Sequence, residues 1–182
     1  MIEQDVTGSI VRSLIKNDIS VYSAHTNFDI ADGGMNDILC DKLGLSGVRR
    51  FTESECTDPF GKPLDQIGRV GILDTPIEMA DFVDYVKNVL GCMAISYVGS
   101  ESEIISTAAV CSGSGGDLIY NAYHAGADVY VTSEIKHHEA QLALELGINL
   151  IDAGHFGTEN IICDFMEDYL LSRFDDISIT KS

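Results

Sequence analysis

The sequence is short of basic residues, with 11 lysines and arginines against 29 aspartates and glutamates and a formal net charge of −18. Nucleic-acid binding and docking on an anionic membrane both need a basic surface, so neither kind of partner is expected. The simplest explanation of the excess of acidic residues is that their charge keeps the protein soluble. An acidic field also raises the local concentration of cations, so the composition is compatible with metal binding.

The chain also lacks the segments that would place it outside the cytoplasm. No apolar run approaches the roughly 20 residues that cross a bilayer, and the N-terminus, MIEQDVTGSIVRSL, has neither the basic nor the apolar region of a signal peptide. The five cysteines include no C-x-x-C pair and are too widely spaced for a disulfide framework or a zinc ribbon. Reduced thiols in a cytoplasmic protein are the simplest interpretation.

What is present is a chain of 182 residues, 45% of them hydrophobic, which predicts a single α/β domain over 1–182. Helical spacing predicts helices over residues 7–16, 35–43, 79–90, 118–126, 136–147 and about 158–174. Alternation or short apolar runs predict strands over residues 19–25, 48–54, 67–73, 104–111, 128–132 and 148–154. The second half repeats strand, turn and helix, which predicts a mixed, largely parallel sheet flanked by helices, with function at the carboxyl ends of its strands.

The segment DAGHFGTEN places His155 and Glu159 four residues apart, where a buried strand joins a helix. If the helix begins near His155, both side chains lie on one face, an arrangement typical of metal ligands. The glycines at 154 and 157 let the backbone approach closely. The alternative is structural: His155 caps the turn, and Glu159 interacts with the helix dipole.

The segment SAHTNFD supplies a second candidate pair at the end of the first predicted strand. Asp29 can coordinate or bridge a cation, and His25 can bind it directly or orient a group that does. An Asx-turn formed by Asn27 or Asp29 explains the same residues without a metal. Both interpretations stay open at this stage.

The Gly-rich segment CSGSGGD lies between a predicted strand and a helix. The backbone N–H groups of Ser112, Gly113, Ser114, Gly115 and Gly116 could form an anion-binding nest. A tight turn that needs small residues is the alternative. Cys111, at the end of an apolar strand, is expected to be buried as a small hydrophobe rather than to act as a nucleophile.

The segment SEIKHHEA carries two adjacent histidines that must point in different directions on a helix. His137 is expected at the surface. His138 is the candidate for a catalytic role as a proton shuttle near neutral pH.

Three runs taken together resemble one known family: NDISVYSAHTNFDIADGGMND, AAVCSGSGGDLIYNAYHAGADVYVTSEIKHHEA and LGINLIDAGHFGTENI. They are similar, in sequence and in order, to the Nif-three-like dinuclear metal centre family, whose members are also known as homologues of GTP cyclohydrolase I type 2. The resemblance covers nearly the whole chain.

The resemblance implies a mixed α/β fold, a ring-shaped homohexamer and two adjacent divalent ions in each subunit. Carried over, the metal ligands fall on Asp29, His155 and Glu159, and His25 and His138 match polar positions around the metals. Mixed carboxylate and imidazole ligands suit zinc, manganese, iron or nickel.

One departure from the family pattern matters. The family also has a pair of adjacent histidines upstream, and this sequence has no histidine before His25. The chain therefore resembles the C-terminal portion of a family member, and we expect it to bind one metal ion weakly or none. A metal-dependent hydrolase with an anionic or nucleotide substrate is the leading hypothesis. The alternatives are a non-catalytic metal-binding or partner-binding assembly protein and an inactive truncated remnant.

Overall fold

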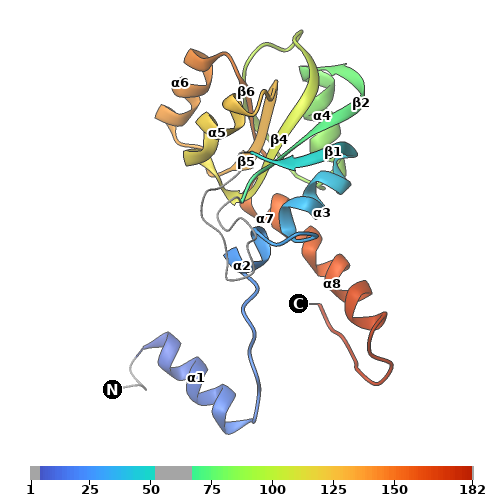
Figure 1. Cartoon of the computed structure of the whole chain (residues 1–182). Coiled ribbons are helices and arrows are strands. Elements are labelled where there is room, and N and C mark those ends of the chain that lie inside the picture. Colours follow the sequence, from blue (N-terminus) through green and yellow to red (C-terminus); the bar gives the residue numbers. More distant parts are fainter. Residues whose placement is uncertain (1–4, 52–66, 182) are drawn as a thin grey trace, which may run out of the picture.

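The computed structural model describes residues 5–51 and 67–181, and its centre is one six-stranded sheet (Figure 1). The strands lie in the order β1 (Leu45–Arg50), β2 (Arg69–Glu78), β4 (Ile104–Ser114), β5 (Val129–Ser133), β6 (Asn149–Asp152) and β3 (Ser96–Val98). The α/β class and the mixed sheet confirm the prediction from the sequence.

The prediction that most strands pair in parallel was wrong for the sheet as a whole. Among the described strands, β4, β5 and β6 pair in parallel, whereas β1–β2, β2–β4 and β3–β6 pair antiparallel. The parallel prediction came from the strand–turn–helix rhythm of the second half, and it holds there because each connection is a crossover helix. The first half has no such rhythm, and its strands reverse direction.

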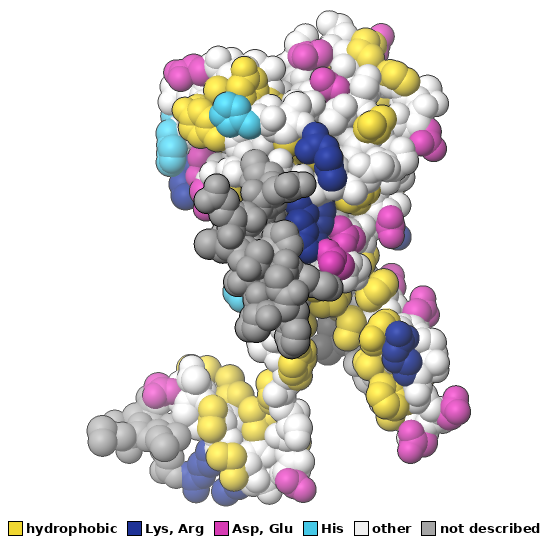
Figure 2. All heavy atoms as spheres, in the orientation of Figure 1, with side chains coloured by type: hydrophobic (Ala, Val, Ile, Leu, Met, Phe, Trp, Pro, Cys, Tyr) yellow, Lys and Arg dark blue, Asp and Glu magenta, His cyan; other side chains and the backbone are white. Residues whose placement is uncertain are grey.

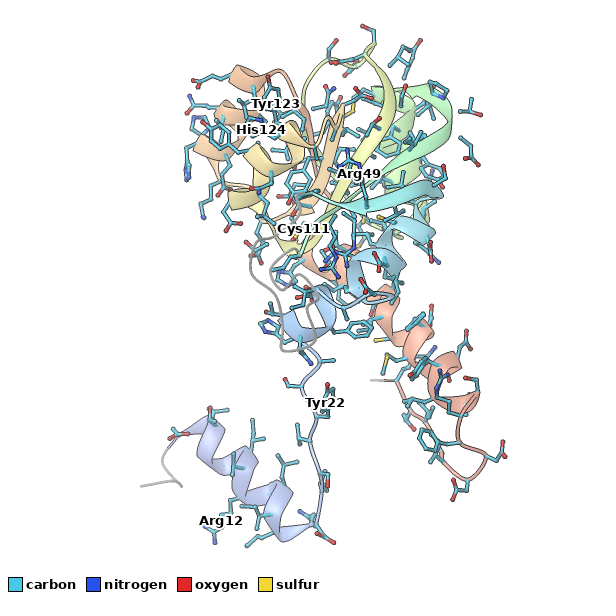
Figure 3. All side chains as sticks on the ribbon, in the orientation of Figure 1. Arg12, Tyr22, Arg49, Cys111, Tyr123 and His124 are labelled. Carbon is cyan, nitrogen blue, oxygen red and sulfur yellow. The ribbon has the colours of Figure 1, made fainter. Side chains whose placement is uncertain are left out.

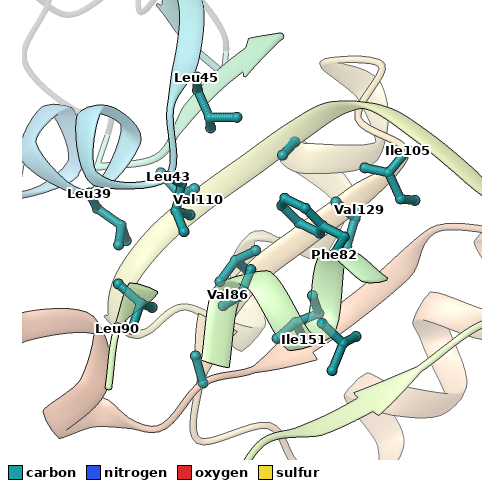
Figure 4. Close-up of a cluster of buried hydrophobic side chains, with 14 of the residues drawn as sticks. Leu39, Leu43, Leu45, Phe82, Val86, Leu90, Ile105, Val110, Val129 and Ile151 are labelled. Carbon is teal, nitrogen blue, oxygen red and sulfur yellow. The ribbon is translucent and has the colours of Figure 1, made fainter. Parts of the chain in front are cut away.

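Helices cover both faces of the sheet because its central strands are apolar on both sides. Along β5, Val129 and Val131 pack into one buried cluster, and Tyr130 packs into the other. The first cluster includes side chains of α3 (Met35–Lys42) and α4 (Met79–Val89), as Figure 4 shows. The second includes side chains of α5 (Ile119–His124) and α6 (His137–Leu146).

The N-terminal part departs most from the sequence-based prediction. The helix α1 (Val6–Lys16) forms as expected, and its N-terminal cap is Asp5, which accepts a hydrogen bond from the Gly8 N–H. The strand predicted over residues 19–25 is absent: residues 19–24 run outside any helix or strand and lead to the short helix α2 (Thr26–Asp29). The residues of this stretch have strand-like alternation, but no described strand pairs with them, and a strand needs a neighbour for its backbone hydrogen bonds.

Three smaller differences concern element boundaries. The long C-terminal helix begins earlier than predicted and is divided into α7 (His155–Glu159) and α8 (Ile161–Leu171). The short edge strand β3 was not predicted. Residues 52–54 of the strand predicted over 48–54 lie outside the described residues. No helix in the described part of the chain is long and apolar enough to cross a membrane.

Candidate metal centre

The parallel strands end together at one edge of the sheet, and a cavity of about 280 Å³ lies there. Cys111, labelled in Figure 3, marks this end of β4. The lining residues come from four separate parts of the chain: His25, Thr26, Asp29, Ile67, Cys111, Ser112, Gly113, Ser114, Asp117, Leu118, His155 and Glu159. The topology therefore unites three of the four segments that the sequence pattern singled out separately.

The helix α7 holds the most clearly paired groups of the cavity. It begins at His155, so the i,i+4 spacing places the His155 Nε2 atom 3.2 Å from Glu159 Oε1. Gly154, at φ +75°, provides the turn from β6 into this helix. An imidazole nitrogen and a carboxylate oxygen side by side at a cavity wall form one half of a ligand set for a divalent ion.

The Gly-rich turn after β4 approaches this pair closely. Gly113 has φ +64°, and a Cβ atom built there would lie 2.5 Å from Glu159 Oε1 and 3.2 Å from His155 Nε2. A side chain at this position would fill the space in front of both groups. Two constraints therefore require glycine at position 113: its positive φ, and the close approach of the Glu159 and His155 side chains.

Asp29, at the end of α2, also lines the cavity. Its backbone carbonyl accepts a hydrogen bond of 3.1 Å from Asn36 Nδ2, and the Oδ1 atom of this fully buried asparagine accepts one of 2.8 Å from the Ser112 N–H. Asn36 thus ties the Asp29 segment to the Gly-rich turn. Partial burial and the nearby Glu159 carboxylate raise the pKa of Asp29, against the lowering effect of His25 and His155.

A buried ion pair also stabilises the segment that carries Asp29. The Arg69 side chain is almost fully buried and pairs with Asp37, 2.5 Å away. Its guanidinium also donates to the carbonyls of Ile30 and Ala31, immediately after Asp29. This arrangement holds the segment that carries Asp29 against the sheet.

The backbone of the Gly-rich turn is only partly available to a ligand. The Ser112 N–H donates to Asn36, and the Gly113 N–H donates to Thr158 Oγ1 at 3.0 Å. Gly115 and Gly116 do not line the cavity but pack closely against neighbouring side chains, among them Thr132 and Glu139. Fewer backbone N–H groups are therefore available to a ligand in the cavity than the nest predicted over residues 112–116 would offer.

Of the two histidines predicted to be catalytic, the structure places one at the site. His25 lines the cavity, whereas His138 is exposed on α6 and does not line it. The expectation that His138 faces the site is wrong, because the first turn of α6 directs Glu139 inward instead. The Glu139 carboxylate accepts a hydrogen bond from the Lys136 N–H, and His138 lies 3.9 Å from it on the solvent side.

The sequence pattern missed Glu134, which follows β5. Its Oε1 atom lies 2.9 Å from His155 Nδ1, on the side of the ring away from Glu159. This hydrogen bond is the main cause of a raised pKa at His155, to which Glu159 also contributes while burial opposes it. Glu134 belongs to the segment SEIKHHEA, in which the two adjacent histidines are the more conspicuous candidates.

These residues fit one side of a divalent-ion site. The chemistry of Asp29, His155 and Glu159 suits such an ion, and Gly113 keeps the space before two of them clear. In the part of the chain that the structure describes, no three His, Cys, Asp or Glu side chains are already gathered closely enough to hold an ion.

Comparison with known proteins identifies the family. A profile of the Duf34/NIF3 (NGG1p interacting factor 3) family matches residues 1–182. The chain is 36% identical over 168 residues to a GTP cyclohydrolase 1 type 2 homolog of Clostridium perfringens, covering 92% of this chain and 62% of that protein. The chain thus spans less than two thirds of that relative's length.

Solved structures agree with this relationship. The hypothetical protein SA1388 of Staphylococcus aureus superposes with a TM-score of 0.82 at 28% identity, covering 96% of this chain and 68% of that one. Reduced HcgD from Methanocaldococcus jannaschii superposes with a TM-score of 0.76 at 30% identity, covering 94% of this chain and 64% of that one. By sequence and by fold, the chain belongs to the Duf34/NIF3 family.

Proposed function

We propose that the chain is a divalent-metal-binding protein with a hydrolase-like activity, of the kind named GTP cyclohydrolase 1 type 2 homolog. The observation that carries the proposal is the cavity in which His155 Nε2 and Glu159 Oε1 lie 3.2 Å apart, beside Gly113 and together with Asp29. Of several candidate segments spread over the sequence, three contribute to this one cavity.

In this proposal Asp29, His155 and Glu159 hold the metal. A bound divalent ion lowers the pKa of water toward neutrality and stabilises negative charge on a reacting oxygen. His25, at the same cavity, is the candidate to accept or deliver a proton, a task that imidazole side chains commonly perform. The donor set suits zinc, manganese, iron or nickel.

The substrate we propose is a small anionic molecule such as a nucleotide. Ser112 lines the cavity, and its Oγ is a buried side-chain oxygen without a hydrogen-bond partner among the described residues. An unpaired buried hydroxyl is costly, so a ligand oxygen that pairs with it would be favoured. Ser114, which is exposed in the same cavity, offers a second hydroxyl.

Two further proposals concern the setting of the protein. We propose a cytoplasmic location, supported by the free cysteines Cys40, Cys92, Cys111 and Cys163. We also propose the ring-shaped homohexamer of the family. The apolar side chains that α1 exposes, among them Ile10 and Ile15, are compatible with burial between subunits.

Metal analysis tests the central proposal. We expect the purified chain to bind one zinc or manganese ion weakly in calorimetric titration, and Asp29→Ala and Glu159→Gln to abolish that binding. Glu145→Gln, at an exposed carboxylate of α6, is the matched control and should bind as the wild type does. Two tightly held ions per chain would contradict the expected stoichiometry, and unchanged binding in both site variants would contradict the site.

A non-catalytic metal-binding or partner-binding role is the second candidate. The exposed apolar side chains of α1 and α8 favour it, because such surfaces mark interaction sites. Turnover separates the two functions: metal-loaded protein is screened against nucleotides, with Asp29→Ala beside it. Hydrolysis that disappears in the variant supports the enzyme, and hydrolysis that persists in the variant removes the catalytic proposal.

A further inference from the structure

Glu134 combines two features that call for a common explanation. It is one of two described non-glycine residues with a positive φ, at +59°, a conformation that a Cβ atom disfavours. Its Oε1 atom also lies 2.9 Å from Nδ1 of His155. A glutamate with no task at this position could be replaced by a residue that tolerates the conformation, such as glycine or asparagine.

A side chain from the neighbouring strand bonds to the backbone directly after Glu134. Asp152, the last residue of β6, accepts a hydrogen bond from the Ile135 N–H through Oδ2 and one from the Gly154 N–H through Oδ1, each 3.0 Å long. One carboxylate thereby joins the turn that carries Glu134 to the turn that carries His155. The two turns leave adjacent parallel strands, β5 and β6, so their separation is set by the sheet.

The contact decides which nitrogen of His155 can face a ligand. The hydrogen bond holds Nδ1 toward Glu134, so Nε2, which lies 3.2 Å from Glu159 Oε1, is the nitrogen that borders the cavity. A divalent ion held by Nε2 and Glu159 would leave the ring N–H at Nδ1, where the Glu134 carboxylate accepts its hydrogen bond. Carboxylate–histidine pairs of this kind orient metal-binding histidines in many proteins.

We infer that Glu134 is the positioning residue of the metal centre, and that its strained backbone is retained because it directs His155 Nε2 toward the ion. The second half of this inference, the direction of His155 Nε2 toward an ion, rests on the proposed metal-binding function. Its first half, the orientation of the His155 ring by the hydrogen bond at Nδ1, concerns the chain without any metal.

The experiment uses variants that separate strain from contact. Glu134→Asn tolerates the positive φ but is too short to keep the contact, and Glu134→Gln keeps the length but loses the charge. Glu145→Gln, an exposed carboxylate on α6, is the matched control. Each variant is examined by ¹⁵N NMR of the histidine rings in alkaline buffer, by thermal unfolding and by zinc titration.

We expect the Nδ1 resonance of wild-type His155 to show a hydrogen bond to a carboxylate and Glu134→Asn to lose it without a fall in Tm. Zinc affinity should decrease about 10- to 100-fold in Glu134→Asn and less in Glu134→Gln. If the Nδ1 resonance and the affinity are unchanged in Glu134→Asn, the inference is overturned. If the Nδ1 resonance follows Glu134 but wild type takes up no ion, the positioning role stands and the proposed metal function fails.

Discussion

The sheet and the N-terminal arm, which comprises α1 and the extended residues 19–24, are built from similar side chains but bury them very differently. Phe82 and Val86 of α4 are fully buried against the sheet, whereas Ile15 of α1 is 76% and Val21 of the arm 68% exposed. Figure 1 shows α1 standing apart from the sheet, and Figure 2 shows hydrophobic side chains gathered on its surface. Amphipathic spacing therefore determines that a helix forms, but burial requires a second surface that matches it.

The largest expected difference is in stability. Phe82→Ala should lower the free energy of unfolding by about 3–5 kcal/mol, because it opens a cavity in a packed cluster. Ile15→Ala, in the arm, should change it by no more than about 0.5 kcal/mol at a dilution that keeps the chain monomeric, because the side chain of the single chain is already in water. Urea unfolding of both variants measures the contrast. A large effect of Ile15→Ala would mean that α1 is covered in solution, and the comparison would then break down.

A smaller effect is expected where the sheet holds the site. Asn36→Ala should cost about 1–3 kcal/mol, because it leaves the Ser112 N–H and the Asp29 carbonyl without their partner. It should also weaken zinc binding, since Asp29 loses its link to the Gly-rich turn. Asn88→Ala, on the exposed side of α4, is the control for both measurements. Equal metal affinity in Asn36→Ala would show that this link does not position Asp29.

Gly113→Ala tests how closely the turn approaches the ligand pair. A residue other than glycine at φ +64° costs about 1–2 kcal/mol, and the added Cβ would also displace Glu159. Gly126→Ala has a similar φ of +78° but open space around it, so it reports the backbone cost alone. We expect similar losses of Tm from the backbone in both variants and loss of zinc binding in Gly113→Ala only. Loss of binding in Gly126→Ala as well would assign the effect to general destabilisation.

The smallest effect on stability is expected only in alkaline solution and comes from two buried cysteines, Cys40 on α3 and Cys111 on β4. The arm contains no cysteine. Burial raises the pKa of Cys40 and of Cys111 from 9.0 to about 12. Both thiols stay protonated in the fold while they ionise in the unfolded chain, so stability should be complete below pH 9 and fall as the pH rises toward 12.

Unfolding of the double variant Cys40→Ala, Cys111→Ala over the same pH range measures this contribution. Its stability should depend less steeply on alkaline pH than that of the wild type, whatever its stability at neutral pH. Cys163→Ala, on α8, serves as the control. An unchanged slope in the double variant would assign the alkaline loss to other groups.

Local patterns in the sequence were enough for most of the fold. Apolar spacing predicted α4 and α6 closely, and unbroken apolar runs predicted β4 and β5, because these elements bury the faces that the patterns define. The same reasoning failed at residues 19–25, where the alternation was correct for a strand but no described strand pairs with it. Pairing is a property of two segments, and one segment cannot reveal it.

The candidate site likewise has one part that the sequence determined and another that only the tertiary structure decided. The sequence by itself determined which side chains have ligand chemistry, and the spacing of His155 and Glu159 determined that they share one face of a helix. Only the tertiary structure decided that Asp29 joins them at one cavity, that His138 faces solvent and that Glu134 contacts His155. The reason is physical: the parallel strands β4, β5 and β6 end at one edge, and that edge unites residues more than a hundred positions apart.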